Sequence, residues 1–296
     1  MWTSPYPPFE AGGTTVHRMV LDAAGRFGDR PALVDGRSGT VVSYRLLAER
    51  ILGVAAGLAA RGLAPGDTLA LWAPNLPQWA GVALGAMAAG GTVTAASPAA
   101  TERELAAQLA DAGASVLVTV PSLVPAARAA AAVSGVRELV VLGRADGAAP
   151  ILDLLADGRL SPGPALDPAA TVALLPYSSG TTGLPKGVEL THANLVTSVR
   201  QVGAGLRVGE GDTLLAVPPL SHIMGFLVTL ALPLSVGATV VTVPRFDPAQ
   251  FLELLERHRV TVLVGAPPML AVLVGHPLAA GTDMGSLELV VGGGRH

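Results

Sequence analysis

The chain has 296 residues, of which half are hydrophobic and 14% are charged, and its formal net charge is −3. This length allows one large domain or two ordinary ones, and the composition is that of a folded chain with a sizeable core. The absence of cysteine excludes disulfide scaffolds, thiolate metal sites and cysteine nucleophiles. No run of Lys and Arg stands out, so we expect no nucleic-acid partner. The N-terminal segment Met1–Glu10 does not resemble a signal peptide, so we expect a cytoplasmic protein.

Two uncharged stretches, Thr68–Thr101 and Thr213–Pro244, raise the question of a membrane-spanning helix. Within the second, the apolar run Gly225–Val243 approaches the ~20 residues that such a helix needs. Pro233 and Gly237 interrupt this run, and buried α/β elements explain both stretches more simply. We therefore expect no stable membrane insertion, and a membrane-associated structural protein is the most distant of three classes of function.

Short strands alternate with amphipathic helices along the first half of the chain, which is the pattern of an α/β fold with mainly parallel sheets. Thr101 and Glu104 form a capping box, which predicts the start of a helix that runs to Ala112. The other elements that we expect there are a hairpin of strands 32–34 and 41–43, helices 44–60 and 78–89, and strands 69–72, 92–95, 116–120 and 139–142.

The segment from about Gly143 to Pro168 is rich in Gly, Pro, Ala and Asp and is the best candidate for a boundary between subdomains. We therefore expect a first α/β subdomain with its linker at residues 1–168 and a second at residues 169–296. In the second, Asp247 followed by Pro248 predicts a helix N-terminus. The further elements that we expect are strands 172–176, 238–243 and 260–264, one helix that begins near residue 192 and a second that spans residues 248–258.

A glycine-rich loop follows the strand at 172–176. Its sequence, Ser178-Ser-Gly-Thr-Thr-Gly-Leu-Pro-Lys-Gly187, holds three glycines, four hydroxyl residues and one lysine. Glycines let the backbone curl with its N–H groups pointing inward, which makes a nest for anions. The hydroxyls add donors, Lys186 adds a mobile positive charge, and a helix N-terminus that follows the loop favours phosphate. The segment therefore predicts a polyphosphate-binding loop.

The loop does not match the Walker A pattern of P-loop NTPases, G-x-x-x-x-G-K-[ST]. Pro185 occupies the place of the second glycine, and Gly187 follows the lysine where Ser or Thr is required. Lys186 is the only lysine among nineteen Lys and Arg residues, which suggests a place where a compact ammonium suits better than a planar guanidinium. A lysine left by chance on a solvated loop is the alternative, which the surrounding glycines and hydroxyls disfavour.

The segment from Tyr177 to Asn194 resembles the signature of the adenylate-forming superfamily, which includes acyl-CoA synthetases, coumarate–CoA ligases, luciferases and peptide-synthetase adenylation domains. The resemblance continues in the same order through Pro218–Phe226, Pro244–Asp247 and Ala266–Leu270. It covers essentially the whole chain and favours the coumarate and acyl-CoA ligase branch. It implies the N-terminal part of such a ligase, built of two α/β subdomains.

The resemblance implies a reaction of two steps, in which a carboxylate attacks the α-phosphate of ATP and a thiol, usually that of CoA, then takes the acyl group. ATP, Mg²⁺ and CoA are therefore the expected cofactors, and a small carboxylic acid is the expected partner. Preorganised donors hold the phosphate charge in such a reaction, and Lys186 and Thr181 are expected to be catalytic. The residues expected to hold the ATP phosphates are Ser178, Ser179, Gly180, Thr181, Thr182, Gly183 and Lys186.

The resemblance also implies contacts to the acyl group. The residues expected to make them are His222, Met224, Val228, Gly293 and Gly294. A capped or core histidine is the alternative for His222, and ordinary core packing is the alternative for Met224 and Val228. Ser221 departs from the aromatic residue often found there, which makes the shape of the acyl pocket less certain.

Three further polar positions, Arg245, His192 and Asn194, have side chains of the kind that can contact ligands. Arg245 corresponds to a basic residue that contacts CoA in some relatives, and a solvated arginine before a helix cap is the alternative. His192 and Asn194 are expected to organise the start of a helix and not to touch substrate. The six histidines show no metal-ligand spacing, so no metal ligand is predicted within the chain.

The sequence ends at Val290–His296, where the family has a small-residue strand end that leads to Ala-Pro-Leu. The C-terminal domain, with the family's catalytic lysine and acidic metal ligand, lies beyond this point. The resemblance therefore implies that the C-terminal domain is absent and that the 296 residues alone are inactive or weak. A truncated, non-catalytic nucleotide- or acyl-binding remnant is the alternative to an acyl- or aryl-CoA ligase. Neither the acid nor the oligomeric state is predicted.

Overall fold

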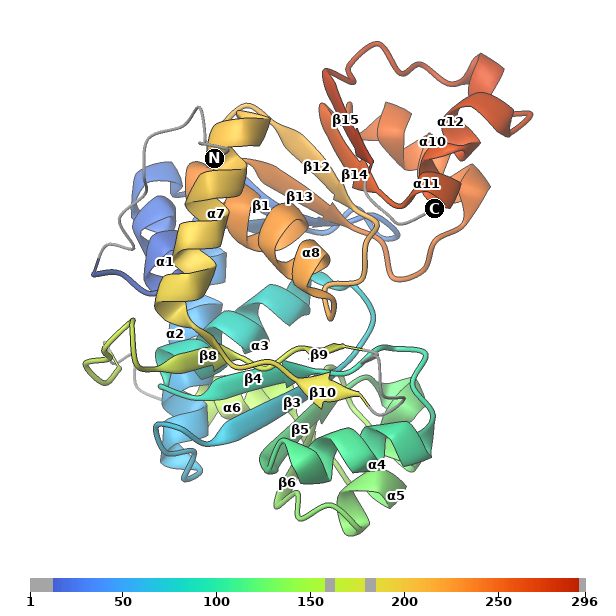
Figure 1. The fold of residues 1–296 in the computed structure, drawn as a ribbon. Coiled ribbons are helices and arrows are strands. Elements are labelled where there is room, and N and C mark those ends of the chain that lie inside the picture. Colours follow the sequence, from blue (N-terminus) through green and yellow to red (C-terminus); the bar gives the residue numbers. More distant parts are fainter. Residues whose placement is uncertain (1–12, 158–162, 179–184, 293–296) are drawn as a thin grey trace, which may run out of the picture.

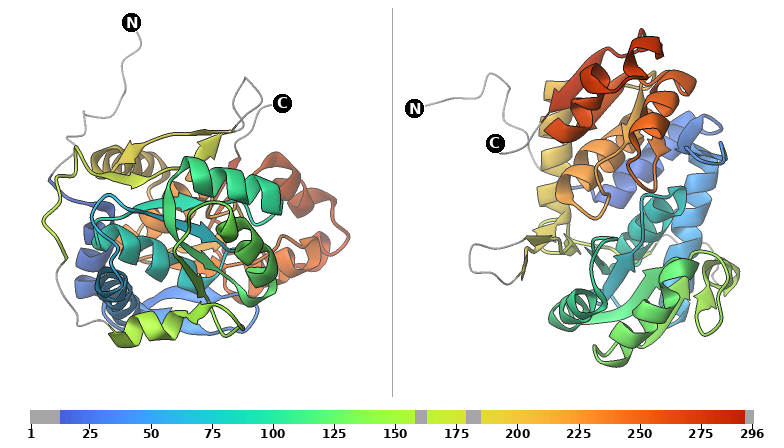
Figure 2. Two further views of the ribbon diagram at one scale, coloured as in Figure 1. Left: turned by 90° about the horizontal axis from the view of Figure 1, so that it is seen from below. Right: turned by 90° about the vertical axis from the view of Figure 1, so that its right-hand side faces the viewer.

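The computed structural model describes residues 13–157, 163–178 and 185–292. Two large sheets lie one above the other in the view of Figure 1, with helices between them and on their outer faces. Figure 2 gives two further views, in which the green helices gather at one sheet and the red helices at the other. The fold is α/β with mainly parallel sheets, as the alternation of elements predicts.

The first sheet of the described chain consists of β3 (Thr68–Trp72), β4 (Thr92–Ala95), β5 (Ala114–Thr119), β6 (Glu138–Val141), β7 (Ala149–Pro150), β8 (Val172–Leu174) and β11 (Leu190–Thr191). Their order is β11-β8-β4-β3-β5-β6-β7, and the pairs are parallel except that of β11 with β8. Strands β3 and β4 are buried along their whole length. Continuous apolar runs of this kind are typical of parallel sheets that are covered on both faces.

The second sheet consists of β1 (Pro31–Asp35), β2 (Val41–Ser43), β12 (Thr213–Ala216), β13 (Thr239–Thr242), β14 (Val262–Gly265) and β15 (Leu289–Gly292). Their order is β15-β14-β12-β13-β1-β2, and the pairs are parallel except that of the hairpin β1–β2. A separate two-stranded hairpin consists of β9 (Tyr177–Ser178) and β10 (Lys186–Gly187).

Helices cover both faces of the two sheets. Those of the described chain are α1 (Val16–Phe27), α2 (Tyr44–Ala60), α3 (Pro77–Ala88), α4 (Glu102–Asp111), α5 (Val124–Ala132), α6 (Ile151–Asp157), α7 (His192–Leu206), α8 (Ile223–Phe226), α9 (Leu232–Val236), α10 (Pro248–Arg257), α11 (Pro267–Leu270) and α12 (Val272–Gly275), with short 3₁₀ turns at η1 (Pro121–Leu123) and η3 (Ala279–Gly281) and a π-helical turn at η2 (Leu227–Ala231). Helix α3 is buried almost throughout, and the ring centroid of its Trp79 lies 6.0 Å from that of Phe226. Leu69 and Val93 of the first sheet share one core cluster with Leu214 of the second. The two sheets are therefore joined by a common core.

The sheets exchange strands across the boundary expected near residue 168. Strands β1 and β2 come from the start of the chain and lie in the second sheet, next to β13. Strands β8 and β11 come after residue 168 and lie in the first sheet, next to β4. A boundary at this position therefore divides the sequence but does not divide the two sheets. The exchange was not predicted, because pairing between strands that are distant in the sequence leaves no local signal.

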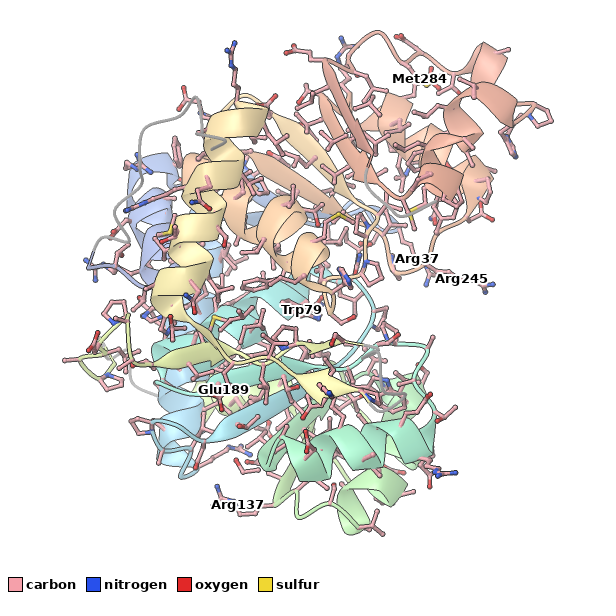
Figure 3. The ribbon with its side chains drawn as sticks, viewed as in Figure 1. Arg37, Trp79, Arg137, Glu189, Arg245 and Met284 are labelled. Carbon is pink, nitrogen blue, oxygen red and sulfur yellow. The ribbon has the colours of Figure 1, made fainter. Side chains whose placement is uncertain are left out.

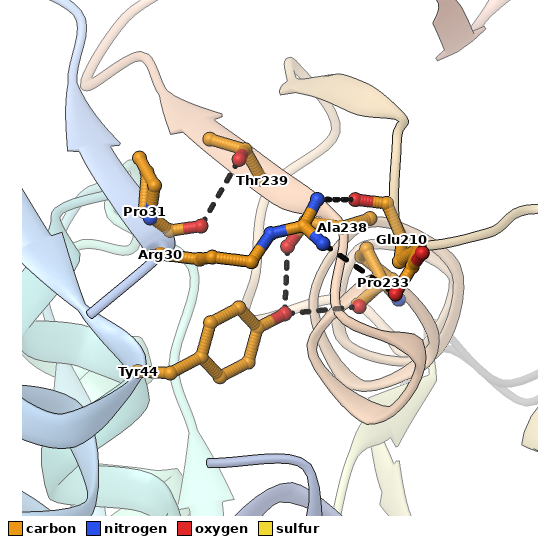
Figure 4. Close-up of polar contacts among 7 residues, drawn as sticks. All are labelled: Arg30, Pro31, Tyr44, Glu210, Pro233, Ala238 and Thr239. Atoms are coloured by element: carbon orange, nitrogen blue, oxygen red, sulfur yellow. Dashed lines mark hydrogen bonds and ion pairs between the residues drawn. The ribbon is translucent and has the colours of Figure 1, made fainter. Parts of the chain in front are cut away.

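Tyr44 at the start of α2 and Arg30 directly before β1 fasten the N-terminal hairpin to the rest of the second sheet (Figure 4). The buried Tyr44 hydroxyl donates to the carbonyl oxygens of Ala238 at 2.7 Å and Pro233 at 3.3 Å. Arg30 forms an ion pair with Glu210 at 3.4 Å, and its guanidinium also donates to the carbonyl oxygen of that residue. Burial raises the pKa of Tyr44, so the hydroxyl keeps its proton and remains a donor.

Local signals located many of the elements correctly. Helix α2 spans the predicted residues 44–60, and strand β4 spans the predicted 92–95. The predicted capping box of α4 is present, with the Glu104 amide donating to the Thr101 hydroxyl at 3.3 Å. Asp247 caps α10, with Pro248 in its first turn. Helices α1 and α5 and the π-helical turn were not predicted. Across the described ranges, no helix has both the length and the apolar character needed to cross a membrane.

Candidate functional site

The hairpin β9–β10 forms the stem of the glycine-rich loop. Lys186 lies opposite Ser178 in an antiparallel pair, so the two ends of the loop are adjacent. Both residues are exposed. The residues between them that were predicted to hold phosphate lie outside the described residues; these are Ser179, Gly180, Thr181, Thr182 and Gly183. The structure thus brings together Ser178 and Lys186 of the predicted phosphate-binding set.

Hydrogen bonds of Leu175, just before the stem, and of Tyr177, within it, connect the stem to the first sheet and to α4. The Thr94 hydroxyl donates to the carbonyl oxygen of Leu175 at 2.9 Å, and the Leu175 amide donates to that of Val93 at 2.8 Å. The Tyr177 hydroxyl donates to the Asp111 carboxylate at the end of α4. Burial and this hydrogen bond raise the pKa of Tyr177, so the hydroxyl remains a donor. The stem is therefore fixed from strand β4 and from helix α4.

Two acidic residues lie beside the β9–β10 stem. Recesses of about 530 and 520 Å³ lie there and share Asp111, Leu175 and Glu189. Both acidic residues are exposed, and Figure 3 shows Glu189 near the first sheet. Negative charge at these recesses disfavours phosphate, so we do not assign them to the polyphosphate. The described residues contain no group of three or more His, Asp or Glu placed to hold a metal ion.

Helix α7 begins at His192, as predicted, directly after β11, and a capping box closes its N-terminus. The Thr191 hydroxyl accepts from the Asn194 amide at 3.3 Å, while the Asn194 side chain accepts from the Thr191 amide at 3.0 Å. The fully buried His192 accepts from the Val16 amide at 3.3 Å, and its ring centroid lies 5.3 Å from that of His17. His192 and Asn194 therefore organise the start of the helix, as predicted.

The two histidines share a site that disfavours positive charge. Burial lowers the pKa of His17 to about 3, with additional effects of His192 and Arg18. Burial lowers the pKa of His192 to about 4. Nδ1 of His17 and Nε2 of His192 are buried and have no hydrogen-bond partner among the residues that the structure describes. A proton added to either ring would therefore be poorly solvated.

Three of the five predicted acyl-contacting residues lie at the start of, or on, one continuous helical segment. His222 precedes α8, and its Nδ1 accepts from the Met224 amide at 3.3 Å. The α-helical turns continue into the π-helical turn η2, which contains Val228, and then into α9. Met224 and Val228 are partly buried against the main core, whereas His222 is exposed. The three residues therefore lie close together in the chain and in the fold, and their contact with an acyl group remains a prediction. Gly293 and Gly294 lie outside the described residues.

Asn75 is a residue near this segment that sequence analysis missed. Its amide nitrogen donates to the carbonyl oxygens of Ala216 at 2.8 Å and Pro218 at 3.0 Å. Its amide oxygen accepts from the Leu220 amide at 2.8 Å, and the side chain is buried. The signal in the sequence is a polar residue three positions after the buried strand β3, where parallel strands present ligand-binding loops.

Arg245 lies on the loop after β13 and is exposed. Arg37 lies on the turn after β1, the parallel neighbour of β13, and is also exposed. Figure 3 shows the two residues at the same edge of the second sheet. The structure thus places a second cation beside the one that was predicted to contact CoA.

A family model described as AMP-binding enzyme matches residues 20–296. The chain belongs to the AMP-binding enzyme family. Among curated relatives of this family, 4-coumarate–CoA ligase 5 of Oryza sativa subsp. japonica is 36% identical over 286 residues, which are 94% of this chain and 52% of that protein. 4-Coumarate–CoA ligase 3 of the same organism is 36% identical over 298 residues, or 99% of this chain and 54% of that protein. The chain spans about half the length of these curated relatives.

A solved structure matches the fold of this member of the AMP-binding enzyme family. A natural red-emitting luciferase from Phrixothrix hirtus superposes with a TM-score of 0.88 at 22% identity, covering 98% of this chain and 57% of the luciferase. At this identity the likeness concerns the fold. Together with the family match and the coverage of the curated relatives, the fold described above is that of the N-terminal part of an adenylate-forming ligase.

Proposed function

We propose that this chain binds ATP and a carboxylic acid for formation of an acyl-adenylate, and that the acyl group then passes to CoA. The observation that carries the proposal is the pairing of Lys186 with Ser178, which closes a loop of glycines and hydroxyls at one point. Backbone N–H groups and an ammonium placed together in this way stabilise the charge that develops as pyrophosphate leaves.

The proposed acyl site is the segment that starts at His222. Its exposed imidazole stands at the N-terminus of α8, and the apolar Met224 and Val228 follow on the same helical segment. A polar group followed by apolar side chains suits a ligand with a carboxylate head and an apolar body. We assign the carboxylate to the His222 end and the acyl body to the other two residues.

Mg²⁺ is expected with ATP, yet the described residues offer no acidic cluster that fits a magnesium ion. We therefore derive no step through the metal. CoA carries phosphate groups, and the exposed Arg245 and Arg37 are the cations that we assign to them. The relatives named above are about twice as long as this chain, so the use of an acid and a thiol and the complete reaction are what we propose for it.

Pyrophosphate exchange into ATP with a panel of aliphatic and aromatic carboxylic acids tests the proposal. We expect the 296 residues to show at most weak acid-dependent exchange, and this exchange should fall about 10²–10³-fold in Lys186→Ala, the usual effect of removing one preorganised donor. Lys186→Arg keeps the charge but offers a planar fork in place of a compact ammonium, so we expect only partial recovery. Arg103→Ala, which removes an exposed cation on α4, should leave exchange unchanged.

A second candidate is a binding protein that holds nucleotide without turnover. Calorimetric titration with ATP separates the candidates. Exchange together with binding supports the enzyme, and binding lost in Lys186→Ala without any exchange supports the second candidate. A folded chain that neither binds ATP nor exchanges pyrophosphate would overturn both.

A further inference from the structure

Asn75 connects the carboxyl ends of two parallel strands that lie in different sheets. It stands three residues after the end of β3, in the first sheet, and its three hydrogen bonds reach the last residue of β12 and the segment that follows it, in the second. The side chain is only 5% exposed. The contact therefore spans the space between the sheets at the end where α/β proteins bind ligands.

These bonds use both donors and an acceptor of one amide side chain. The Nδ2 group donates to Ala216 and Pro218, and Oδ1 accepts from Leu220, at 2.8 to 3.0 Å. The three backbone groups lie at or beyond the end of β12. Such groups need partners when they are buried, and one side chain supplies all three. The amide therefore fixes the backbone on both sides of Pro219.

Pro219 in turn is bonded to His222. Its carbonyl oxygen accepts from the His222 amide at 2.9 Å, which closes a turn directly before α8. From the opposite side, Gly225 of α8 packs so closely that a Cβ atom there would lie 2.0 Å from the same oxygen. The Pro219 carbonyl is thus confined between the residues held by Asn75 and the backbone of α8, and it sets where the His222 backbone begins.

We propose that Asn75 is a positioning residue that sets the place of the His222 imidazole at the acyl site. The inference deepens the proposed function and rests on it for the identity of the ligand. The geometric part concerns the chain alone, because Asn75 acts on His222 through the turn at Pro219. Distortion of the site by a residue that does not touch substrate is expected to affect the carboxylic acid and not ATP.

The geometric part is tested by two-dimensional NMR of the chain labelled on histidine side chains. We expect the His222 resonance, assigned from a His222→Gln spectrum, to shift in Asn75→Ala while those of His258 and His276 stay in place. Gly225→Ala should shift the same resonance, because its methyl group forces the turn from the other side. An unmoved His222 resonance in a folded Asn75→Ala protein would overturn the inference.

Two further variants separate positioning from general destabilisation. Thr119→Val removes another buried side chain–backbone bond, of 2.8 Å to the Trp72 carbonyl oxygen, which stays within the first sheet. It should lower stability without moving the His222 resonance. Asn75→Asp keeps the size and the acceptor but loses both donors, and it carries the test if Asn75→Ala does not fold. A shift of equal size in Thr119→Val would show that the effect is not specific to Asn75.

The functional part is tested by exchange kinetics with one acid that supports exchange in the unmodified chain. We expect Asn75→Ala to raise the half-saturating concentration of the acid, or lower the rate, by about ten- to hundredfold, the scale of a misplaced catalytic geometry. The half-saturating concentration of ATP should stay within about twofold. Equal losses for acid and ATP would overturn the assignment to the acyl site. If the unmodified chain binds neither, the proposed function fails, and the NMR result still decides whether Asn75 positions His222.

Discussion

The guanidinium groups of Arg245 and Arg37 belong to neighbouring loops because β13 and β1 are parallel partners, with Thr242 opposite Asp35. If they hold the phosphates of CoA, Arg37→Ala should slow thioester formation about tenfold, since a charge-assisted hydrogen bond contributes roughly 1.5–3 kcal/mol. Pyrophosphate exchange should be unchanged, because it precedes CoA. The measurement compares both steps in one preparation. Arg103→Ala is the control, and an equal loss of both steps would contradict the assignment.

The buried pair His17 and His192 makes stability depend on pH. Their folded-state pKa values, about 3 and about 4, lie below the 6.5 of the free side chain. The unfolded chain therefore binds more protons below pH 6.5, and the free energy of unfolding should fall as the pH drops from about 6.5 towards 4, by up to ~1.4 kcal/mol per pH unit for each histidine. Urea unfolding at several pH values measures this slope.

His17→Gln should reduce the slope in this pH range, since one of the two proton-binding sites is removed. His276→Gln is the control, because that residue lies far along the chain in the segment after α12. A slope that is the same in His17→Gln and the parent chain would show that the pair does not control acid stability.

At the residue level, local sequence predicted roles that depend on neighbours in the chain. Asn194 was predicted to organise the start of a helix, and it does so in a capping box with Thr191, three residues away. The role of Asn75 was not, because its partners lie more than 140 residues away in the sequence. His192 was assigned to the helix start correctly, but its contact with Val16 has no local pattern.

Helix α7 follows the loop, and its cap is expected to matter beyond stability. Thr191→Ala should cost about 1 kcal/mol of unfolding free energy, the usual value for an N-cap. It should also weaken ATP binding, because the cap holds the helix start that follows the phosphate loop. Thr101→Ala removes the matching capping box of α4 and should cost a similar free energy without changing ATP affinity. Denaturant unfolding and calorimetric ATP titration measure the two effects, and equal affinities in both variants would contradict this role.

The ends of helices and strands with strong local signals were predicted to within one or two residues. The change from α-helical to π-helical geometry was not predicted. The segment from Ile223 to Val236 passes from α-helical to π-helical geometry at Leu227–Ala231 and back. In it the Thr229 hydroxyl donates to the Gly225 carbonyl oxygen at 2.7 Å. π-helical turns often occur at functional sites, and here the turn contains Val228. Hydrophobic periodicity does not distinguish a single π turn from a helix broken by Pro233.

For the molecule as a whole, the shared core predicts that both sheets unfold together. Tyr44→Phe removes the donor to Ala238 and Pro233 and leaves buried carbonyl oxygens without it, so we expect a loss of about 1–3 kcal/mol. Circular dichroism and tryptophan fluorescence should report one coincident transition in the parent chain and in the variant. Two separate transitions would show that the sheets are independent units.

The exchange of strands between the sheets also limits the order in which the chain can assemble during synthesis. Asp35 must wait for Thr242 before β1 gains its parallel neighbour, so the second sheet cannot close until most of the chain has left the ribosome. The first sheet likewise lacks β8 and β11 until residue 191 is available. Cutting the gene between residues 157 and 163 would yield two pieces that each carry an incomplete sheet, and only their coexpression should restore a soluble product.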